Sequence, residues 1–359
     1  MIITCPDCHT RFNLQDDTAR KVSAKVRCSR CGNVFSVARP TVSEPSRRPV
    51  PGSGYSPAPT YGGVTPGAGS PTVGRMPHTR MAERPGPKTN HSRCVVMAVT
   101  NQKGGVAKTS TCLNLGTALA LQNKRVLLVD FDIQANLTSA LGDRPAGSFF
   151  DIVEKGTQAI GAVLAKTPYE NVWLLPSNPQ LALVGRKGSK IAQPMHVLRD
   201  VLSSIRGDFD FILIDTPPSI EFFTLNALMA ADFIIIPSQC ETFSIHGVDQ
   251  IEKAIDVIRD KQVVDIEYRV LITMYDPEKT VARVIHEKIK KRYRDRSFET
   301  VIEMDEKLSE SQVVRKPVIF YDRQSASARQ YIDLAKEVLQ YPATSAGQMA
   351  PMGRLAAVH

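Results

Sequence analysis

The residues between Val99 and Ser110 read VTNQKGGVAKTS and follow directly on a short apolar run. Glycines let backbone N–H groups turn towards phosphate oxygens, and the start of a following helix adds partial positive charge. A lysine and a threonine hydroxyl at the end of such a loop can bind phosphates and a magnesium ion. We therefore predict a phosphate-binding loop made of Lys103, Gly104, Gly105, Val106, Ala107, Lys108, Thr109 and Ser110.

Three side chains at the end of this loop have distinct expected roles. Lys108 is expected to contact the β- and γ-phosphates of ATP, and the Thr109 hydroxyl to bind Mg²⁺. The Ser110 hydroxyl is expected to lie near the α-phosphate. These roles require the loop to sit between a buried strand and a helix, so the elements around it decide the prediction.

Short β-rich apolar runs alternate with helical patterns from residue 94 onward. Strands are predicted at 94–100, 125–130, 171–176, 210–215, 232–237 and 268–274, with a weaker one at 298–302. Helices are predicted near 108–122, 194–206, 219–230, 245–262, 280–294 and 325–340. Because continuous apolar strands are buried on both faces, we predict an α/β fold with a doubly wound, mostly parallel sheet. Such sheets bind ligands at the carboxyl ends of their strands.

Two further segments follow predicted strands and carry acidic side chains. The first reads DFDIQAN from Asp130 to Asn136, and the second reads IDTPPS from Ile214 to Ser219. Together with a loop that has Lys103 ahead of its glycines, they resemble the P-loop ATPases of the ParA/MinD class, and the ParA family in particular. The segments PSQCETFSIHG from Pro237 and KLSE from Lys307 also resemble ParA, so the resemblance covers 94–340.

The resemblance implies roles that the residue pattern alone does not. It implies that Lys103 crosses into the site of a second copy in an ATP-bound homodimer, and that Asp132 positions the attacking water. It further implies that Asp215 binds Mg²⁺. The catalytic residues would then be Lys103, Lys108 and Asp132, acting in slow hydrolysis of ATP to ADP and phosphate. A ParB-like or cargo protein is the implied activator.

Two residues depart from the family pattern. Ile133 stands where relatives usually have proline, and Ala107 stands where they usually have the glycine before the loop lysine. The Cβ of Ala107 narrows the loop and is expected to affect hydrolysis or affinity. We expect ATP binding to persist.

Two C-x-x-C pairs lie near the start of the chain. Cys5 and Cys8 are separated from Cys28 and Cys31 by 19 residues. Four thiolates at this spacing can close a tetrahedral shell around zinc and leave no position for a catalytic water. Disulfides or a redox dithiol are the alternatives, but no secretory signal supports disulfides. The segment 1–38 resembles the bacterial zinc-ribbon finger, whose partners are nucleic acids or proteins.

Composition and charge divide the chain into four parts. Residues 1–39, the predicted zinc ribbon, and 40–92 each carry a net charge of +4, out of +9 for all 359 residues. Residues 40–92 hold 11 of the 24 prolines and are predicted to be a disordered linker. Residues 93–342, the predicted ATPase domain, have no net charge, and 343–359 form the predicted flexible tail.

The ATPase domain therefore needs local patches if it is to bind a polyanion. The residues that fit non-specific contact with DNA phosphates are Lys279, Arg283, Lys290, Arg292 and Lys307. Nearby acidic residues weaken this prediction, and a solvated helix face is the alternative.

No apolar run approaches the ~18–20 residues that span a bilayer, and Asp7 interrupts the start of the chain. We expect a cytoplasmic protein without membrane insertion, associated with the nucleoid if it binds DNA. A ParA-like ATPase that segregates DNA or positions a protein assembly is the favoured interpretation. A MinD-like spatial regulator and an ATP-controlled zinc-ribbon regulator that binds nucleic acid are the alternatives.

Overall fold

The computed structural model describes residues 2–4, 6–8, 11–13, 23–27, 31, 33–38, 93–141, 147–187, 193–262 and 266–341. The predicted linker 40–92 and the predicted tail 343–359 lie outside these residues. The chain falls into two units, residues 1–71 and 72–359, and each is described by itself.

The first unit contains two antiparallel strand pairs. β1 (Ile2–Thr4) pairs with β2 (Arg11–Asn13), and β3 (Ser23–Arg27) pairs with β4 (Val34–Ala38). Each C-x-x-C pair falls in the connection between two paired strands. Cys8 is half-buried and Cys31 is exposed, while Cys5 and Cys28 lie outside the described residues.

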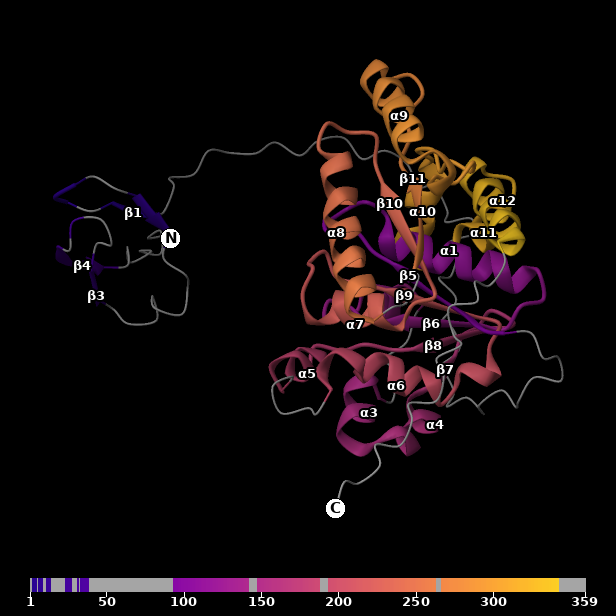
Figure 1. The fold of residues 1–359 in the computed structure, drawn as a ribbon, viewed down its shortest axis with the longest axis horizontal. Helices are drawn as coiled ribbons and strands as arrows, with labels where there is room; N and C mark the ends of the chain where they lie inside the picture. The colour runs from indigo at the N-terminus through magenta and orange to yellow at the C-terminus, as the bar shows by residue number, and fades with distance from the viewer. Residues whose placement is uncertain are drawn as a thin grey trace, which may run out of the picture. The chain divides into compact units, whose positions relative to one another are not determined.

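The described part of the second unit contains one seven-stranded sheet with the order β11-β10-β5-β9-β6-β8-β7. Its strands are β5 (Val95–Val99), β6 (Val126–Asp130), β7 (Ala165–Lys166), β8 (Val172–Leu175), β9 (Phe211–Asp215), β10 (Phe233–Ser238) and β11 (Glu267–Ile272). Neighbouring strands are parallel except the edge pair β7 and β8. The predicted doubly wound, mostly parallel sheet is confirmed (Figure 1).

Helices cover both faces of this sheet. The longer ones are α1 (Lys108–Leu121), α7 (Phe222–Ala230), α8 (Ser244–Gln262), α9 (Thr280–Tyr293), α10 (Glu306–Val313) and α12 (Ala326–Gln340). The shorter ones are α2 (Asn136–Ala140), α3 (Phe149–Lys155), α4 (Ile160–Val163), α5 (Leu181–Lys187), α6 (Val197–Ser203) and α11 (Val318–Tyr321).

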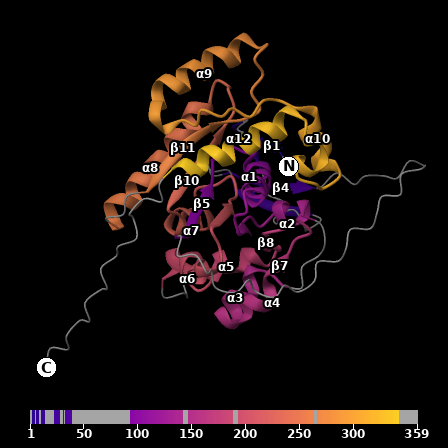
Figure 2. The same cartoon turned by 90° about the vertical axis from the view of Figure 1, so that its right-hand side faces the viewer.

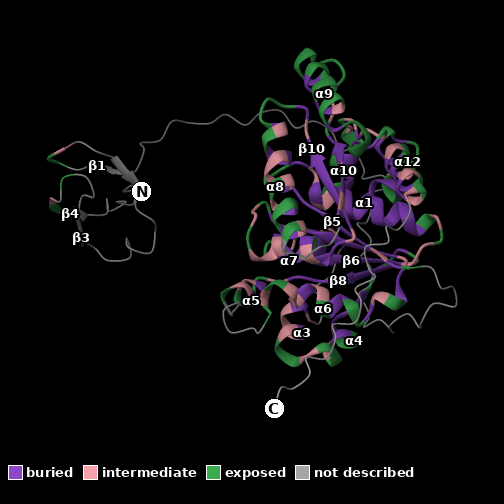
Figure 3. Ribbon diagram, viewed as in Figure 1, coloured by how far each residue is buried: buried purple, intermediate pink, exposed green. Residues whose placement is uncertain are grey.

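Alternate strand residues face two separate apolar layers, as the two-residue period of a strand requires. In β6, Leu127 and Val129 pack towards α3, α6, α7 and α8, whereas Val126 and Leu128 pack towards α1, α11 and α12. β6, β8, β9 and β10 are buried along their whole length (Figure 3). α1 and α12 lie side by side in both views (Figure 1, Figure 2).

Close contact between α1 and the sheet depends on Gly116. A Cβ at this position would stand 2.5 Å from Cδ2 of Leu128, so a larger residue would force the helix away from β6. Since Lys108 and Thr109 open the same helix, this contact also sets the distance between the phosphate loop and the sheet.

The structure differs from the predicted elements in two ways. The segment 298–302 is not a strand, because it joins β11 only through single hydrogen bonds such as that from Phe298 N to the Val270 oxygen. The short helices α2, α3, α4, α5, α10 and α11 were not predicted, because helices of 4–8 residues carry little periodicity.

Candidate nucleotide-binding site

The ends of three adjacent strands meet at the candidate site. The loop 100–107 follows β5, while Asp215 ends β9 and Asp130 ends β6, and the two aspartates stand at paired positions of neighbouring strands. A cavity of about 680 Å³ opens here and is lined by Gly104, Gly105, Ala107, Lys108, Thr109, Ser110, Asp132, Thr216 and residues of α10. This volume falls within the range of small-molecule pockets.

The two residues predicted to bind Mg²⁺, Thr109 and Asp215, lie where the loop meets β9. The Thr109 hydroxyl donates to Oδ2 of Asp215 at 2.7 Å, and Oδ1 of Asp215 is buried without a partner. Burial, together with the nearby Asp130 carboxylate, raises the pKa of Asp215 well above its usual range. A half-buried hydroxyl beside a buried carboxylate with an unpartnered oxygen fits a hard divalent cation, because oxygen ligands suit such an ion and its positive charge stabilises the ionised carboxylate.

Lys108 is held at the floor of the cavity. Its side chain is only 8% exposed, and its ammonium donates to the carbonyl oxygen of Lys103 at 3.0 Å. Burial lowers the pKa of Lys108, while the nearby Asp215 and Asp132 carboxylates oppose the shift. A buried cation with one hydrogen bond can bind an anion strongly, as a phosphate-binding lysine must.

The loop reaches this geometry through left-handed backbone at Gly105 (φ 73°) and at Ala107 (φ 66°, ψ 31°). A Cβ at Gly104 or Gly105 would meet no protein atom within 4 Å, which leaves space for a ligand beside the backbone. At Ala107 the Cβ is present, and an L-residue in this region costs about 1 kcal/mol.

We therefore expect Ala107→Gly to stabilise the protein by about 0.5–1 kcal/mol, because relief of the left-handed strain outweighs the extra entropy of glycine in the unfolded chain. Thermal unfolding followed by circular dichroism measures this. Ala254→Gly, within the helical backbone of α8, is the matched control and is expected to lower stability by about 1 kcal/mol. A lower melting temperature for Ala107→Gly would contradict the strain.

Asp132 projects from the loop after β6 and is only 7% exposed on the cavity wall. Its Oδ1 accepts a hydrogen bond from Gln134 N at 3.0 Å, and its carbonyl oxygen accepts one from the Ser177 hydroxyl at 2.7 Å. These contacts keep the carboxylate on the side of the cavity that holds Lys108 and Thr109.

Asp130 supports this loop from beneath. Its Oδ2 accepts from Thr138 N at 2.7 Å and from the Thr138 hydroxyl at 2.6 Å, while Oδ1 accepts from Asp132 N at 3.2 Å. Burial raises the pKa of Asp130 to about 6. Sequence reasoning assigns no role to Asp130 or Ser177. The only signal for Asp130 is its place two residues before Asp132, the predicted water-positioning residue.

Replacing Asp130 with asparagine should lower kcat for ATP hydrolysis by about tenfold and leave nucleotide affinity within about twofold. Three donors bond to the Asp130 carboxylate. The asparagine side chain has only one oxygen to accept from them, and its NH₂ group cannot accept, so one hydrogen bond that holds the Asp132 loop is lost. Steady-state kinetics and a nucleotide titration measure the two quantities. A change confined to affinity would show that Asp130 does not act through Asp132.

The far end of the cavity is formed by α10 and the segment before it. Gln312 donates from Nε2 to the Ser110 hydroxyl at 2.9 Å, and Met304 and Leu308 line the wall. Asp305 caps α10 through Lys307 N at 2.9 Å and accepts from Ser327 N at 2.9 Å. The sequence singled out part of α10, the segment KLSE from Lys307, only as resembling ParA and gave it no place in the site, because it lies about 200 residues after the loop and no local pattern links the two segments.

Comparison with known proteins places this site in a family. Residues 94–310 match the family model described as an AAA domain. The sporulation initiation inhibitor protein Soj of Bacillus subtilis is 39% identical over 252 residues, covering 68% of this chain and 97% of that protein. The chromosome partitioning protein ParA of Caulobacter vibrioides is 34% identical over 250 residues, covering 68% and 93%. The chain belongs to the ParA family of ATPases.

Solved structures agree with this assignment. The cobyrinic acid a,c-diamide synthase of Mycobacterium smegmatis, solved with bound ADP and magnesium, is 33% identical with a TM-score of 0.59 and covers 68% of this chain and 94% of its own. The cell division ATPase MinD of Pyrococcus furiosus has a TM-score of 0.58 at 24% identity, covers 68% and 98%, and shows the shared fold alone.

Residues 1–36 match the family model of a zinc-ribbon domain, which supports the predicted N-terminal fold. Two of the four predicted ligands, Cys5 and Cys28, fall outside the described residues. Within the described parts of the chain, no group of three or more His, Cys, Asp or Glu residues could hold a metal ion. In the same parts, no helix has the length and apolar character needed to cross a membrane.

The five basic residues predicted to contact DNA are engaged within this ParA-family domain. Ion pairs join Lys279 to Asp276 at 3.1 Å, Lys290 to Glu299 at 2.8 Å, Arg292 to Asp249 at 2.7 Å and Lys307 to Glu310 at 2.8 Å. Arg283 donates to the carbonyl oxygen of Pro277 at 2.7 Å. Four of the five positive charges therefore have an acidic neighbour.

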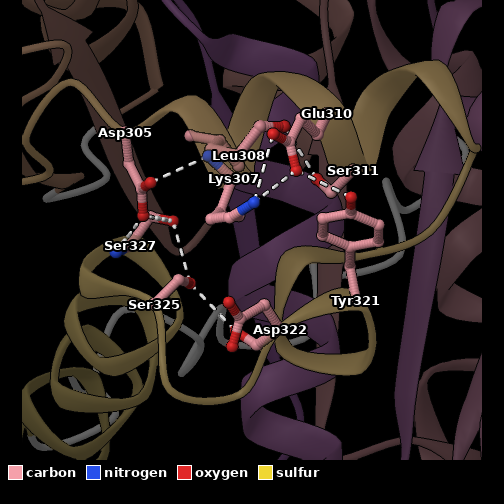
Figure 4. Close-up of polar contacts among 9 residues, drawn as sticks. All are labelled: Asp305, Lys307, Leu308, Glu310, Ser311, Tyr321, Asp322, Ser325 and Ser327. Carbon is pink, nitrogen blue, oxygen red and sulfur yellow. Dashed lines mark hydrogen bonds and ion pairs between the residues drawn. The ribbon is translucent and has the colours of Figure 1, made fainter.

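Figure 4 shows the pair formed by Lys307 and Glu310. The Lys307 ammonium contacts both carboxylate oxygens of Glu310, and the Tyr321 hydroxyl donates to the same carboxylate at 2.7 Å. Lys288, Lys291 and Arg294, on and just after α9, make no ion pair within the described part of the domain. Within the described residues, the basic side chains between positions 280 and 294 without an ion pair are therefore these three and Arg283 of the predicted set.

Proposed function

We propose that the protein is a Mg²⁺-dependent ATPase of the ParA type that uses ATP to dimerise and to segregate DNA or position a protein assembly in a bacterial cell. The observation that carries this proposal is the hydrogen bond from the half-buried Thr109 hydroxyl to the buried Asp215 carboxylate, whose other oxygen has no hydrogen-bond partner. The names of Soj and ParA, two relatives that align over nearly their whole length, support the partitioning role.

In this proposal each side chain has one task. Lys108 and the backbone N–H groups of the loop bind the phosphates, and Thr109 and Asp215 hold the metal ion, which neutralises charge on the phosphates when bound. Asp132 orients a water for in-line attack on the γ-phosphate. The Ser110 hydroxyl accepts a hydrogen bond from Gln312 Nε2 and can donate its own proton to the α-phosphate.

We further propose a homodimer in which Lys103 reaches the phosphates of the second copy. Hydrolysis then requires dimerisation, and ATP acts as a switch between two surfaces. A ParB-like or cargo protein is the proposed activator of this composite site.

The proposed domains are a zinc ribbon (1–39), a linker (40–92), the ATPase domain (93–342) and a tail (343–359). We propose non-specific DNA binding, with Lys288, Lys291 and Arg294 as the principal contacts of the ATPase domain and the basic segment 1–92 as a second source of charge. The proposed location is the cytoplasm, in association with the nucleoid.

Titration of unrelated DNA duplexes with protein saturated with a non-hydrolysable ATP analogue and Mg²⁺ tests this function. We expect equal affinity for all duplexes, loss of binding with ADP, and a steep decrease in affinity with salt. Lys288→Ala should reduce the slope of log K against log salt by about one. If the protein hydrolysed ATP but bound no DNA, the proposed DNA binding would be wrong and only the proposed ATPase activity would stand.

A second candidate function is that of an ATP-controlled regulator whose zinc ribbon recognises nucleic acid. The neutralised cations of the ATPase domain favour it, because the net charge of +8 lies in residues 1–92. Sequence-specific retention on DNA that disappears with Cys28→Ser would support this candidate. Unchanged affinity and salt slope after removal of 1–92 would instead make the ribbon a protein-binding module.

A further inference from the structure

Lys103 is held by its own chain at the rim of the candidate site. Its ammonium contacts the Glu241 carboxylate and also donates to Oε1 of Gln239 at 3.3 Å. The Lys103 side chain is 35% exposed and that of Glu241 is 60% exposed, so water reaches the ion pair. Of the two lysines in the loop, Lys108 donates to a backbone oxygen of the loop itself, whereas Lys103 contacts the segment after β10.

The segment that carries Glu241 is anchored to the phosphate loop at several points. Gln239 donates from Nε2 to the Gly105 carbonyl oxygen at 2.9 Å, and Asn101 donates from Nδ2 to the Pro237 oxygen at 2.7 Å. Lys103 N in turn donates to Oδ1 of Asn101 at 3.0 Å. The two segments therefore hold the lysine and the glutamate beside each other.

The position of Glu241 is also fixed from its other side. Glu241 N donates to the Ser244 hydroxyl at 3.2 Å, and Ser244 N donates to the Glu241 oxygen at 3.0 Å. This tight turn precedes α8 and leaves Phe243 78% exposed. A large apolar side chain that is this exposed, two residues after Glu241, is suited to burial by another protein surface.

We propose that Glu241 is the counter-ion that restrains Lys103 while the protein is a single copy, so that dimerisation with ATP has to break two Lys103–Glu241 pairs. The inference rests on the proposed ATP-bound dimer. A lysine ammonium that moves to the partner's phosphates leaves its own carboxylate, and the several charges of a triphosphate attract it more strongly than one carboxylate does. ADP has fewer charges and competes less well.

The magnitude of this restraint follows from its exposure. An exposed ion pair contributes little, up to about a fivefold factor in an equilibrium constant. Because two pairs break for each dimer, removing the carboxylate should tighten the dimer by about 3- to 25-fold. The Lys103–Glu241 pair therefore raises the protein concentration needed for dimers to form but does not prevent dimerisation.

The test compares dimer dissociation constants of the full-length protein with a non-hydrolysable ATP analogue and Mg²⁺, measured by sedimentation. Glu241→Gln keeps the shape of the side chain and removes its charge, and we expect the dissociation constant to fall by about 3- to 25-fold. Asp260→Asn, which removes the same charge at the far end of α8, is the matched control and should leave it unchanged.

A double mutant decides whether the effect passes through the lysine. In a Lys103→Ala background, Glu241→Gln should no longer change the dissociation constant. An unchanged or weaker dimer for Glu241→Gln alone, or an equal gain in the Lys103→Ala background, would overturn the inference. A wild-type protein that stays a single copy with the analogue would instead overturn the proposed dimer, and the two failures are thus distinguishable.

Discussion

Lys108→Ala is expected to lower kcat/KM for Mg²⁺-ATP by at least about 10³-fold. The ammonium is the buried cation of the phosphate loop, and its only hydrogen bond in the described structure is to the Lys103 carbonyl oxygen at 3.0 Å. Removal of one such group from a preorganised site costs about 10²–10³ in kcat, and the loss of phosphate affinity adds to it. A phosphate-release assay and a nucleotide titration measure both parts.

The control for this substitution is Lys124→Ala, which removes the same charge beyond the other end of α1 and should retain wild-type activity. Far-ultraviolet circular dichroism should show equal helix content for both variants. If Lys108→Ala hydrolysed ATP at the native rate, the proposed role of Lys108 in ATP hydrolysis would be wrong.

Asp132→Asn is expected to separate binding from hydrolysis. The amide oxygen can still accept from Gln134 N, which Asp132 Oδ1 does at 3.0 Å, so the loop should keep its shape. The carboxylate that we propose orients the water is lost, and kcat should fall by about 10²–10⁴-fold. ATP affinity should change by less than about threefold, because phosphate binding uses Lys108 and the loop.

Single-turnover hydrolysis and equilibrium binding of ATP together give this result. Asp200→Asn, at an exposed aspartate of α6, is the matched control. The ATP-bound form of Asp132→Asn should accumulate, and it is therefore the variant of choice for studying the proposed dimer. Equal losses in affinity and turnover would mean that Asp132 serves the structure of the loop alone.

Much of this molecule could be read from local patterns in the chain. The order of strand, glycine-rich loop and helix around Lys108 is contiguous, so a short window contains the whole phosphate loop. Six predicted strands agree with β5, β6, β8, β9, β10 and β11 to within two residues at each end, because buried parallel strands are continuous apolar runs bounded by polar residues.

Predictions were weaker wherever a residue's neighbours come from distant segments. Of the five basic residues expected to contact DNA, Lys279 and Lys307 pair with carboxylates three residues away, but Arg292 pairs with one from a distant helix. Asp249 lies 43 residues before its partner Arg292, a separation that no periodicity records.

The amino-acid order alone was enough to specify the parallel α/β architecture, the phosphate loop and the aspartates at two strand ends, because each depends on a short stretch of chain. Only the folded chain could bring Thr109 to the Asp215 carboxylate, form the cavity wall from α10, and pair Lys103 with Glu241. Those contacts join residues more than 100 positions apart, and their geometry depends on strand order and helix packing, which no local sequence pattern encodes.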